Sequence, residues 1–221
     1  LERYVRAVYM EKTRSEDFAY LLGLFKVAYM REFASADIKT PEYEDGVNML
    51  TNWFERTDLE NVEVLSVEVK DSMNIKTKDG IKKYNYIWDR CDRFTEHGKT
   101  IIRVVDYKTI RAYLSPEDVR NKIQAKMYAM AAATQFKEMQ PDEIWIQFDL
   151  LRYGTIDVKF TREENVETWK FVKKTADRII DMPDENVPET LGPGCMFCVR
   201  KANCHTLRKN VNAEGIMVPA G

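Results

Sequence analysis

The sequence lacks an apolar run of membrane-spanning length, and its first residues show no signal-peptide pattern. We therefore expect no membrane association and a cytoplasmic location. A basic excess is also absent, because the formal net charge is −2 and the pI is about 5.9. Nucleic-acid-binding domains usually carry such an excess, so the overall charge argues modestly against that class of protein.

Cysteine and histidine are scarce, with four and two residues respectively. Three cysteines nevertheless form a C-x2-C-x5-C pattern at Cys195, Cys198 and Cys204. In a reducing cytoplasm, such a cluster indicates a metal site or its remnant rather than disulfide bonds. With His205 as a fourth ligand, the pattern would suit zinc.

The length of 221 residues and the hydrophobic content of 44% are typical of one soluble domain with a full core, so we expect a single domain over residues 1–221. Local clusters of basic residues could still meet phosphates in spite of the low pI. These clusters are Lys76, Lys78, Lys82 and Lys83, and Arg200, Lys201, Arg208 and Lys209.

Two runs rich in β-formers flank a turn-like segment and predict an antiparallel hairpin; the runs are 84–94 and 100–108, and the turn is 95–99. Side chains two apart on a strand share a face, so Asp106 and Lys108 are expected to project to the same side. Asp92 lies late on the partner strand. We expect it to bring a second carboxylate to the same point.

Two converging carboxylates repel each other unless a cation lies between them, and hard oxygen ligands with room for water suit Mg²⁺ or Mn²⁺. A neighbouring lysine can orient a water molecule or stabilise charge that grows on a phosphate. Asp92, Asp106 and Lys108 together therefore indicate phosphodiester hydrolysis. The structural alternative is that Asp106 and Lys108 only form a salt bridge at a strand end.

A helix is expected to follow this hairpin. The segment Ser115-Pro116-Glu117-Asp118 combines an N-cap, a proline and an acidic first turn, and it predicts a helix that ends near residue 137. Gln124 and Tyr128 lie four residues apart and hence on one face of that helix. The pair is a candidate for the same site, and the alternative is a core tyrosine with a glutamine beside it by chance.

Taken in order, the segments I-W-D-R-C-D-R-F, V-V-D-Y-K-T and Q-A-K-M-Y resemble the RecB-like exonuclease branch of the PD-(D/E)XK nuclease superfamily, which includes CRISPR adaptation nucleases and many phage exonucleases. The resemblance covers most of the chain from about Glu68 onward. It implies an α/β fold with a mixed central β-sheet flanked by helices, a restriction-endonuclease-like core. The roles that it implies are metal binding by Asp92, Asp106 and the backbone carbonyl of Tyr107, positioning of the attacking water by Lys108, and orientation of the lysine and the DNA by Gln124 and Tyr128.

The first helix departs from the family pattern. Relatives often carry G-x-x-x-H there, and counting from Gly23 the histidine position is Val27. Glu32, one turn further on, is a candidate substitute, and an exposed surface glutamate is the alternative. Glu68 lies where relatives commonly carry a glutamate, so it is a possible outer metal-site residue; an exposed strand glutamate is the alternative.

The acid of the first hairpin strand is a choice between two residues. Odd and even positions of a strand face opposite sides, so Asp92 would face away from the site if the register placed Asp89 there. Trp88 stands where the family usually has a small residue. The D-R-F segment around Asp92 resembles the family motif and favours Asp92.

The resemblance extends to the three C-terminal cysteines, which in the family join a fourth cysteine near the N-terminus to hold a [4Fe-4S] cluster. That fourth position is Ala7 or Val8 here. Cys91 would need an unfavourable chain path to replace it, because it lies in the predicted catalytic strand. We expect an iron–sulfur cluster, and the alternatives are zinc or an empty site.

The remaining elements follow from periodicity and caps. Helices are expected at 15–34 with Ser15 as its cap, at 41–56 with Thr40 as its cap, and at 161–180. Strands are expected at 62–76, 144–151 and 155–160, with a tight turn at Asp79-Gly80 and a C-terminal cysteine-cluster segment at 183–210 packed on the domain.

The predicted function is that of a metal-dependent DNA nuclease, specifically an exonuclease on single-stranded or end-bearing DNA. Two other classes remain open. One is a DNA-binding or assembly module whose nuclease site has decayed. The other is a metal-cluster subunit of a recombination or CRISPR-adaptation complex that acts only with a protein partner.

Overall fold

The computed structural model describes residues 1–33, 38–182, 195, 198–199 and 204. The chain divides into two units, Leu1–Ala176 and Asp177–Gly221.

The described helices are α1 (Glu2–Val5), α2 (Phe18–Glu32), α3 (Pro41–Arg56), α4 (Pro116–Asn121), α5 (Ile123–Gln135) and α6 (Arg162–Ile180), with short turns of helix at Arg6–Met10 and Lys137–Met139. The described strands are β1 (Glu63–Val67), β2 (Lys70–Thr77), β3 (Gly80–Ile87), β4 (Arg90–Glu96), β5 (Lys99–Lys108), β6 (Glu143–Leu150) and β7 (Gly154–Phe160). Among the helices so described, none is both long enough and apolar enough to cross a bilayer.

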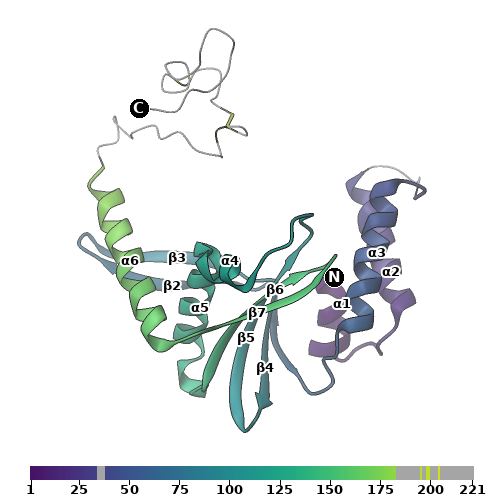
Figure 1. Cartoon of the computed structure of the whole chain (residues 1–221), viewed down its shortest axis with the longest axis horizontal. Helices are drawn as coiled ribbons and strands as arrows, with labels where there is room; N and C mark the ends of the chain where they lie inside the picture. Colours follow the sequence, from purple (N-terminus) through teal and green to yellow (C-terminus); the bar gives the residue numbers. More distant parts are fainter. Residues whose placement is uncertain (34–37, 183–194, 196–197, 200–203, 205–221) are drawn as a thin grey trace. The chain divides into compact units, whose positions relative to one another are not determined.

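A five-stranded sheet forms the centre of the first unit, in the order β1-β4-β5-β6-β7 (Figure 1). β5 and β6 run parallel, and the other neighbouring pairs are antiparallel, so the sheet is mixed. α4 and α5 connect the two parallel strands, as a parallel pair requires a long crossover. The predicted α/β class with a mixed central sheet flanked by helices is confirmed.

The segments predicted as continuous strands over 62–76 and 84–94 each contribute to two separate strands, so the predicted continuity is wrong. β1 and β4 belong to the central sheet, whereas β2 and β3 form a separate two-stranded sheet. The chain leaves one sheet for the other at Glu68, whose φ of 49° is left-handed, and again at Trp88 and Asp89. The Glu68 amide donates to the Asp89 carbonyl at 3.1 Å, which holds the two bends side by side.

The hairpin of β4 and β5 sets the register on which the site depends. Its two-residue turn consists of His97 and Gly98, which have φ values of 50° and 76°. Positive φ at both central positions is the requirement of a type I′ turn, the favoured connection of a two-residue hairpin. The resulting ladder places Asp92 opposite Arg103.

One face of the central sheet packs against α5. The helix presents small buried side chains to the sheet, which allows a close approach; they are Ala125, Ala129, Ala131 and Ala132. The sheet supplies buried aliphatic and aromatic side chains, among them Ile102, Val104, Ile146 and Phe148. This layer is the main hydrophobic core, and burial of its apolar surface is its principal source of stability.

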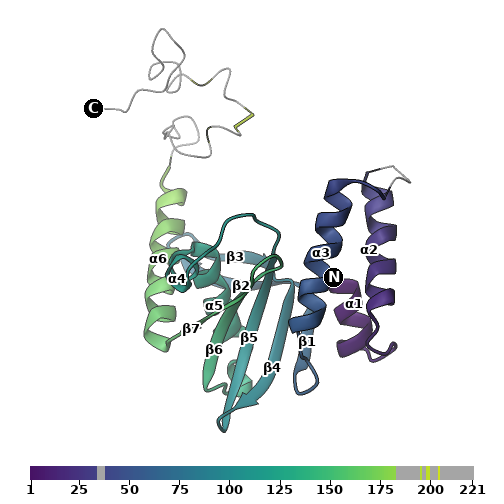
Figure 2. The ribbon, with the colours of Figure 1, turned by 45° about the vertical axis from the view of Figure 1, so that its right-hand side comes forward.

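The opposite face packs against the N-terminal helices near β1, where α3 and α1 lie beside the strand in Figure 2. This second core contains Tyr4, Leu21, Leu50, Trp53 and Val67. The Tyr4 ring meets the Trp53 ring edge-on, with 6.1 Å between the ring centroids. Such aromatic pairs add to the stability gained from area burial alone.

Helix starts and breaks differ in part from the predicted ones. α3 begins as predicted, with the Thr40 hydroxyl accepting from the Tyr43 amide at 3.2 Å. α2 is capped by Asp17 rather than by Ser15, because the Asp17 carboxylate accepts from the Ala19 amide at 2.8 Å. The helix predicted from Pro116 to residue 137 is broken at Lys122, whose ψ of 130° is extended. This break lets α5 follow its own direction over the sheet.

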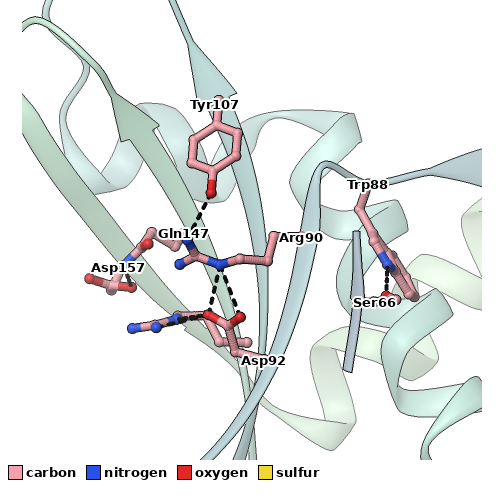
Figure 3. Close-up of polar contacts among 8 residues, drawn as sticks. Ser66, Trp88, Arg90, Asp92, Tyr107, Gln147 and Asp157 are labelled. Atoms are coloured by element: carbon pink, nitrogen blue, oxygen red, sulfur yellow. Dashed lines mark hydrogen bonds and ion pairs between the residues drawn. The ribbon is translucent and has the colours of Figure 1, made fainter. Parts of the chain in front are cut away.

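Buried charges occupy the sheet face opposite α5. Asp92 is fully buried and forms ion pairs with Arg90 and Arg103, each at 2.9 Å. Arg90 also donates to the Tyr107 hydroxyl at 2.7 Å. Figure 3 shows Arg90 directed at the Asp92 carboxylate on the same side of the sheet as Tyr107. The carboxylate therefore offsets the charge of two guanidinium groups that the fold removes from water.

Asp92→Ala is expected to lower the free energy of unfolding by about 3–5 kcal/mol, because it leaves buried guanidinium groups without a counter-charge. Denaturant titration measures the change. Glu63→Ala on the adjacent strand is the matched control, since its ion pair with Arg93 is solvent-exposed. The control should change stability by no more than about 0.5 kcal/mol. Equal effects of the two substitutions would contradict a structural role for Asp92.

Candidate active site

The end of β5 carries an acid and a lysine on the face that packs against α5. Asp106 is 5% exposed and forms an ion pair with Lys108. The Lys108 amine also lies 4.9 Å from the centroid of the Phe148 ring, a cation–π contact. The predicted sharing of one face by Asp106 and Lys108 is confirmed by the register of β5.

α5 adds an amide and a phenol to this pair. Gln124 accepts from the Lys108 amine at 3.1 Å and donates to the Asp106 carboxylate at 3.1 Å. The same Gln124 amide group donates to the Tyr128 hydroxyl at 3.2 Å, and Tyr128 donates to the Ile87 carbonyl at 2.7 Å. The four predicted side chains therefore form one connected hydrogen-bonded set, which also holds α5 to the end of β3.

Asp92 is not part of this set, and the predicted convergence of Asp92 with Asp106 is wrong. Asp92 pairs across the ladder with Arg103, an odd-numbered position of β5, whereas Asp106 is an even-numbered one. Side chains at odd and even positions of one strand face opposite sides. Asp92 therefore lies on the opposite face of the sheet from Asp106, and two arginines neutralise it there.

Asp89 occupies the position that the prediction gave to Asp92. Asp89 lies in the bend just before the first ladder pair, Arg90 with Val105. Its carboxyl group is close enough to Asp106 and to Tyr128 of α5 for their charges to affect one another's pKa values. The Asp89 carboxylate accepts from the Tyr107 amide at 2.6 Å. This is the alternative register, in which Asp89 enters the site and Asp92 faces away.

The two carboxyl groups are electrostatically coupled. Burial raises the pKa of Asp89 to about 6, and the negative charge of Asp106 raises it further. Burial also raises the pKa of Asp106, against the opposing effects of Lys108 and Gln124. Two neighbouring acids with raised pKa values are typical of functional sites.

The donor set fits a small hard cation. The Asp106 Oδ2 atom is buried without a hydrogen-bond partner, although the Lys108 amine faces it as an ion pair. Mg²⁺ usually takes one or two carboxylates and keeps several waters, so Asp89, Asp106 and the backbone carbonyl of Tyr107 suit it. Over the described residues, no group of three or more His, Cys, Asp or Glu side chains is gathered as a metal site.

Two other predicted candidates, Glu68 and Glu32, lie elsewhere. Glu68 is exposed at the left-handed bend. Val27, at the family's histidine position, and Glu32 are both exposed on α2. Glu2 is instead a residue that the sequence did not indicate, because its charge raises the pKa of Asp89 from the far end of the chain.

The cysteine cluster stays a prediction. The Cys198 amide donates to the Cys195 carbonyl at 3.3 Å. His205 and most of 183–210 lie outside the described residues. Cys91 is fully buried in the core beneath α5, and burial raises the pKa of its thiol.

Comparisons with known proteins give one match at the level of sequence families. The model of the PD-(D/E)XK nuclease superfamily matches residues 1–205. No curated protein matches the chain.

Among solved structures, a protein named SSO0001 is 13% identical with a TM-score of 0.39, over 82% of this chain and 80% of that one. A "putative exonuclease" from Eubacterium rectale is 12% identical with a TM-score of 0.41, over 84% and 81%. Both likenesses are too distant to bear on function, whereas the family match spans nearly the whole chain. The chain therefore belongs to the PD-(D/E)XK nuclease superfamily.

Proposed function

We propose that the protein is a metal-dependent DNA nuclease that hydrolyses phosphodiester bonds at DNA ends. The observation that carries the proposal is the connected set in which Gln124 links the Asp106 carboxylate to the Lys108 amine, with Asp89 beside them. A salt bridge alone would need neither the second acid nor the amide link. Membership of a nuclease superfamily supports the same reaction class.

Asp89, Asp106 and the backbone carbonyl of Tyr107 would hold Mg²⁺ or Mn²⁺, which when bound supplies Lewis-acid chemistry at a phosphate. Lys108 is half-buried, and its amine forms an ion pair with the Asp106 carboxylate. Its amine orients the attacking water and stabilises negative charge that grows on the phosphate oxygens. Removal of its ion-pair partner would leave this amine without a fixed direction.

Gln124 fixes the lysine because its carbonyl oxygen accepts from the amine while its NH₂ group donates on the other side. Tyr128 completes the arrangement. Burial raises the pKa of Tyr128 to about 12, so its hydroxyl keeps its proton and continues to donate to the Ile87 carbonyl. Gln124 and Tyr128 are therefore positioning residues, and Lys108 is the group proposed to touch the substrate.

Asp89→Asn should reduce cleavage of labelled single-stranded DNA in Mg²⁺ or Mn²⁺ by at least about 10²-fold, because it removes a ligand of the metal. Lys108→Ala should do the same, because it removes the amine that stabilises developing negative charge. Asp92→Asn is the matched control, with the same chemical change three residues away on the opposite face. It should cleave at the wild-type rate per folded molecule, with the folded fraction taken from circular dichroism. Lys170→Ala, on the exposed surface of α6, controls for loss of a positive charge.

An inactive Asp92→Asn together with an active Asp89→Asn would overturn the assignment of the two acids. DNA binding without cleavage by the wild type would favour the decayed module, and cleavage that appears only with an added protein would favour the subunit. Linear and circular single strands of the same sequence test the end requirement. An exonuclease degrades only the linear form.

Mn²⁺ is expected to raise the Tm of the wild-type protein, because a ligand at 100 times its Kd adds about 2.7 kcal/mol to the free energy of unfolding. Asp89→Asn should lose this rise. Without metal it should melt at the wild-type temperature or above, since the raised pKa of Asp89 means that its ionised form destabilises the fold at neutral pH. Glu68→Gln, at the exposed bend, is the control and should keep the full rise. Equal Mn²⁺ shifts in wild type and Asp89→Asn would contradict the metal site.

The cysteine cluster is proposed to be structural. The protein as purified without oxygen should contain iron with an absorption band at the violet edge of the visible spectrum, or else zinc without that band. A triple cysteine-to-serine variant at Cys195, Cys198 and Cys204 should lose the metal. Elemental analysis measures both metals. Unchanged metal content in the variant would rule out a site built from these three residues.

A further inference from the structure

The segment after β5 exposes aromatic and basic side chains within a few residues of Lys108. Tyr113 in this segment is 72% exposed, and Tyr153 in the turn between β6 and β7 is 50% exposed. Their rings meet at an angle of 76° with 6.5 Å between the centroids. Two large apolar rings left in water as a pair are unusual on a protein surface without a ligand to cover them.

The pair is built into the fold rather than carried on a loose loop. The Tyr153 hydroxyl donates to the Arg111 carbonyl at 2.6 Å. Arg152 in the same turn donates to the Thr109 carbonyl, and the Leu151 amide donates to the Lys108 carbonyl at 3.0 Å. The turn between β6 and β7 therefore holds the segment at Thr109 and Arg111, and the hydrogen bond of its hydroxyl gives Tyr153 a defined direction.

The surroundings of the rings carry an excess of positive charge. Arg111 has a side chain that is 81% exposed, and it lies 3.2 Å from the Asp45 carboxylate of α3. Arg152 pairs with the same carboxylate. One negative charge thus faces two guanidinium groups, and the Arg111 group remains accessible to an anion such as a phosphate.

The position of the rings relative to the candidate active site limits what they could bind. Tyr113 is five residues beyond Lys108, so the two Cα atoms are separated by at most about 18 Å of extended chain. A strand with one phosphate at Asp106 would therefore have its neighbouring nucleotides within reach of the pair. Base stacking on aromatic side chains beside basic groups is how proteins bind unpaired nucleic acid without reading its sequence.

We propose that Tyr113 and Tyr153, with Arg111, form a stacking platform for the unpaired bases of single-stranded DNA next to the candidate active site. This inference rests on the proposed function and specifies its substrate. A paired base cannot leave its stack to lie on these rings without the cost of unpairing. The platform therefore selects single-stranded segments over intact duplex.

The test measures the binding of fluorescent oligo(dT) by anisotropy, in EDTA to prevent hydrolysis. Two other ligands are compared with it: an abasic sugar-phosphate oligomer of the same length and a blunt hairpin duplex. Wild-type protein should bind oligo(dT) more tightly than either. Tyr113→Ala should weaken oligo(dT) binding by about 5- to 100-fold and leave abasic binding unchanged, because only bases stack. Tyr113→Phe should retain the preference. Phe171→Ala, which removes a 56% exposed ring from α6, is the matched control and should have no effect.

Equal affinity of wild type and Tyr113→Ala for oligo(dT) would overturn the platform, as would equal affinity of the wild type for oligo(dT) and the abasic oligomer. Failure of oligo(dT) to bind at all would also overturn the platform, and would favour a protein partner as the ligand of the two rings. The proposed function is tested separately by cleavage in Mn²⁺. Base-dependent binding without cleavage would refute the proposed nuclease activity and support the stacking platform. Cleavage by Tyr113→Ala at the wild-type rate, at subsaturating DNA, would support the nuclease activity and refute the platform.

Discussion

The alternation of side chains along the β4–β5 ladder is the constraint on which the site depends. A two-residue type I′ turn sets the register, and a shift of one residue would exchange the two faces. In this register Asp89 and Asp106 face α5, whereas Asp92 faces the N-terminal helices. The acids of one short segment, D-R-C-D, are thereby sorted into two different environments.

The two faces deal with buried negative charge in different ways. Asp92 is neutralised by the guanidinium groups of Arg90 and Arg103, so its charge is fully compensated within the fold. Asp89 and Asp106 share one lysine, and the pKa of each is raised. Two neighbouring acids with too little compensating charge cost stability, and such arrangements are found at functional sites. The contrast favours the α5 face as the candidate site.

Most of the fold followed from local signals, because caps, turns and alternation act over a few residues. The α3 bounds and its Thr40 cap were predictable in this way. The bend at Glu68 was not, since a left-handed glutamate has no sequence signature and its amide is satisfied by a carbonyl more than twenty residues away. The choice of Asp92 over Asp89 failed for a related reason. Because odd and even positions of a strand face opposite sides, Asp89 and Asp92 had to face opposite sides of the sheet. Only the position where β4 begins decides which of them enters the site. No local pattern could have indicated Glu2.

The bends near Glu68 and Asp89 also explain why α5 can reach the site at all. If β3 continued into β4 as one flat strand, the Ile87 carbonyl would belong to the central ladder and could not accept from Tyr128. Because the chain changes sheet there, that carbonyl is free to hold the Tyr128 hydroxyl, and Tyr128 in turn bonds to Gln124. The direction of the Lys108 amine is thus determined by a break between two strands, through a relay of three hydrogen bonds. The break between β3 and β4 therefore orders Tyr128, Gln124 and Lys108 beside the two acids.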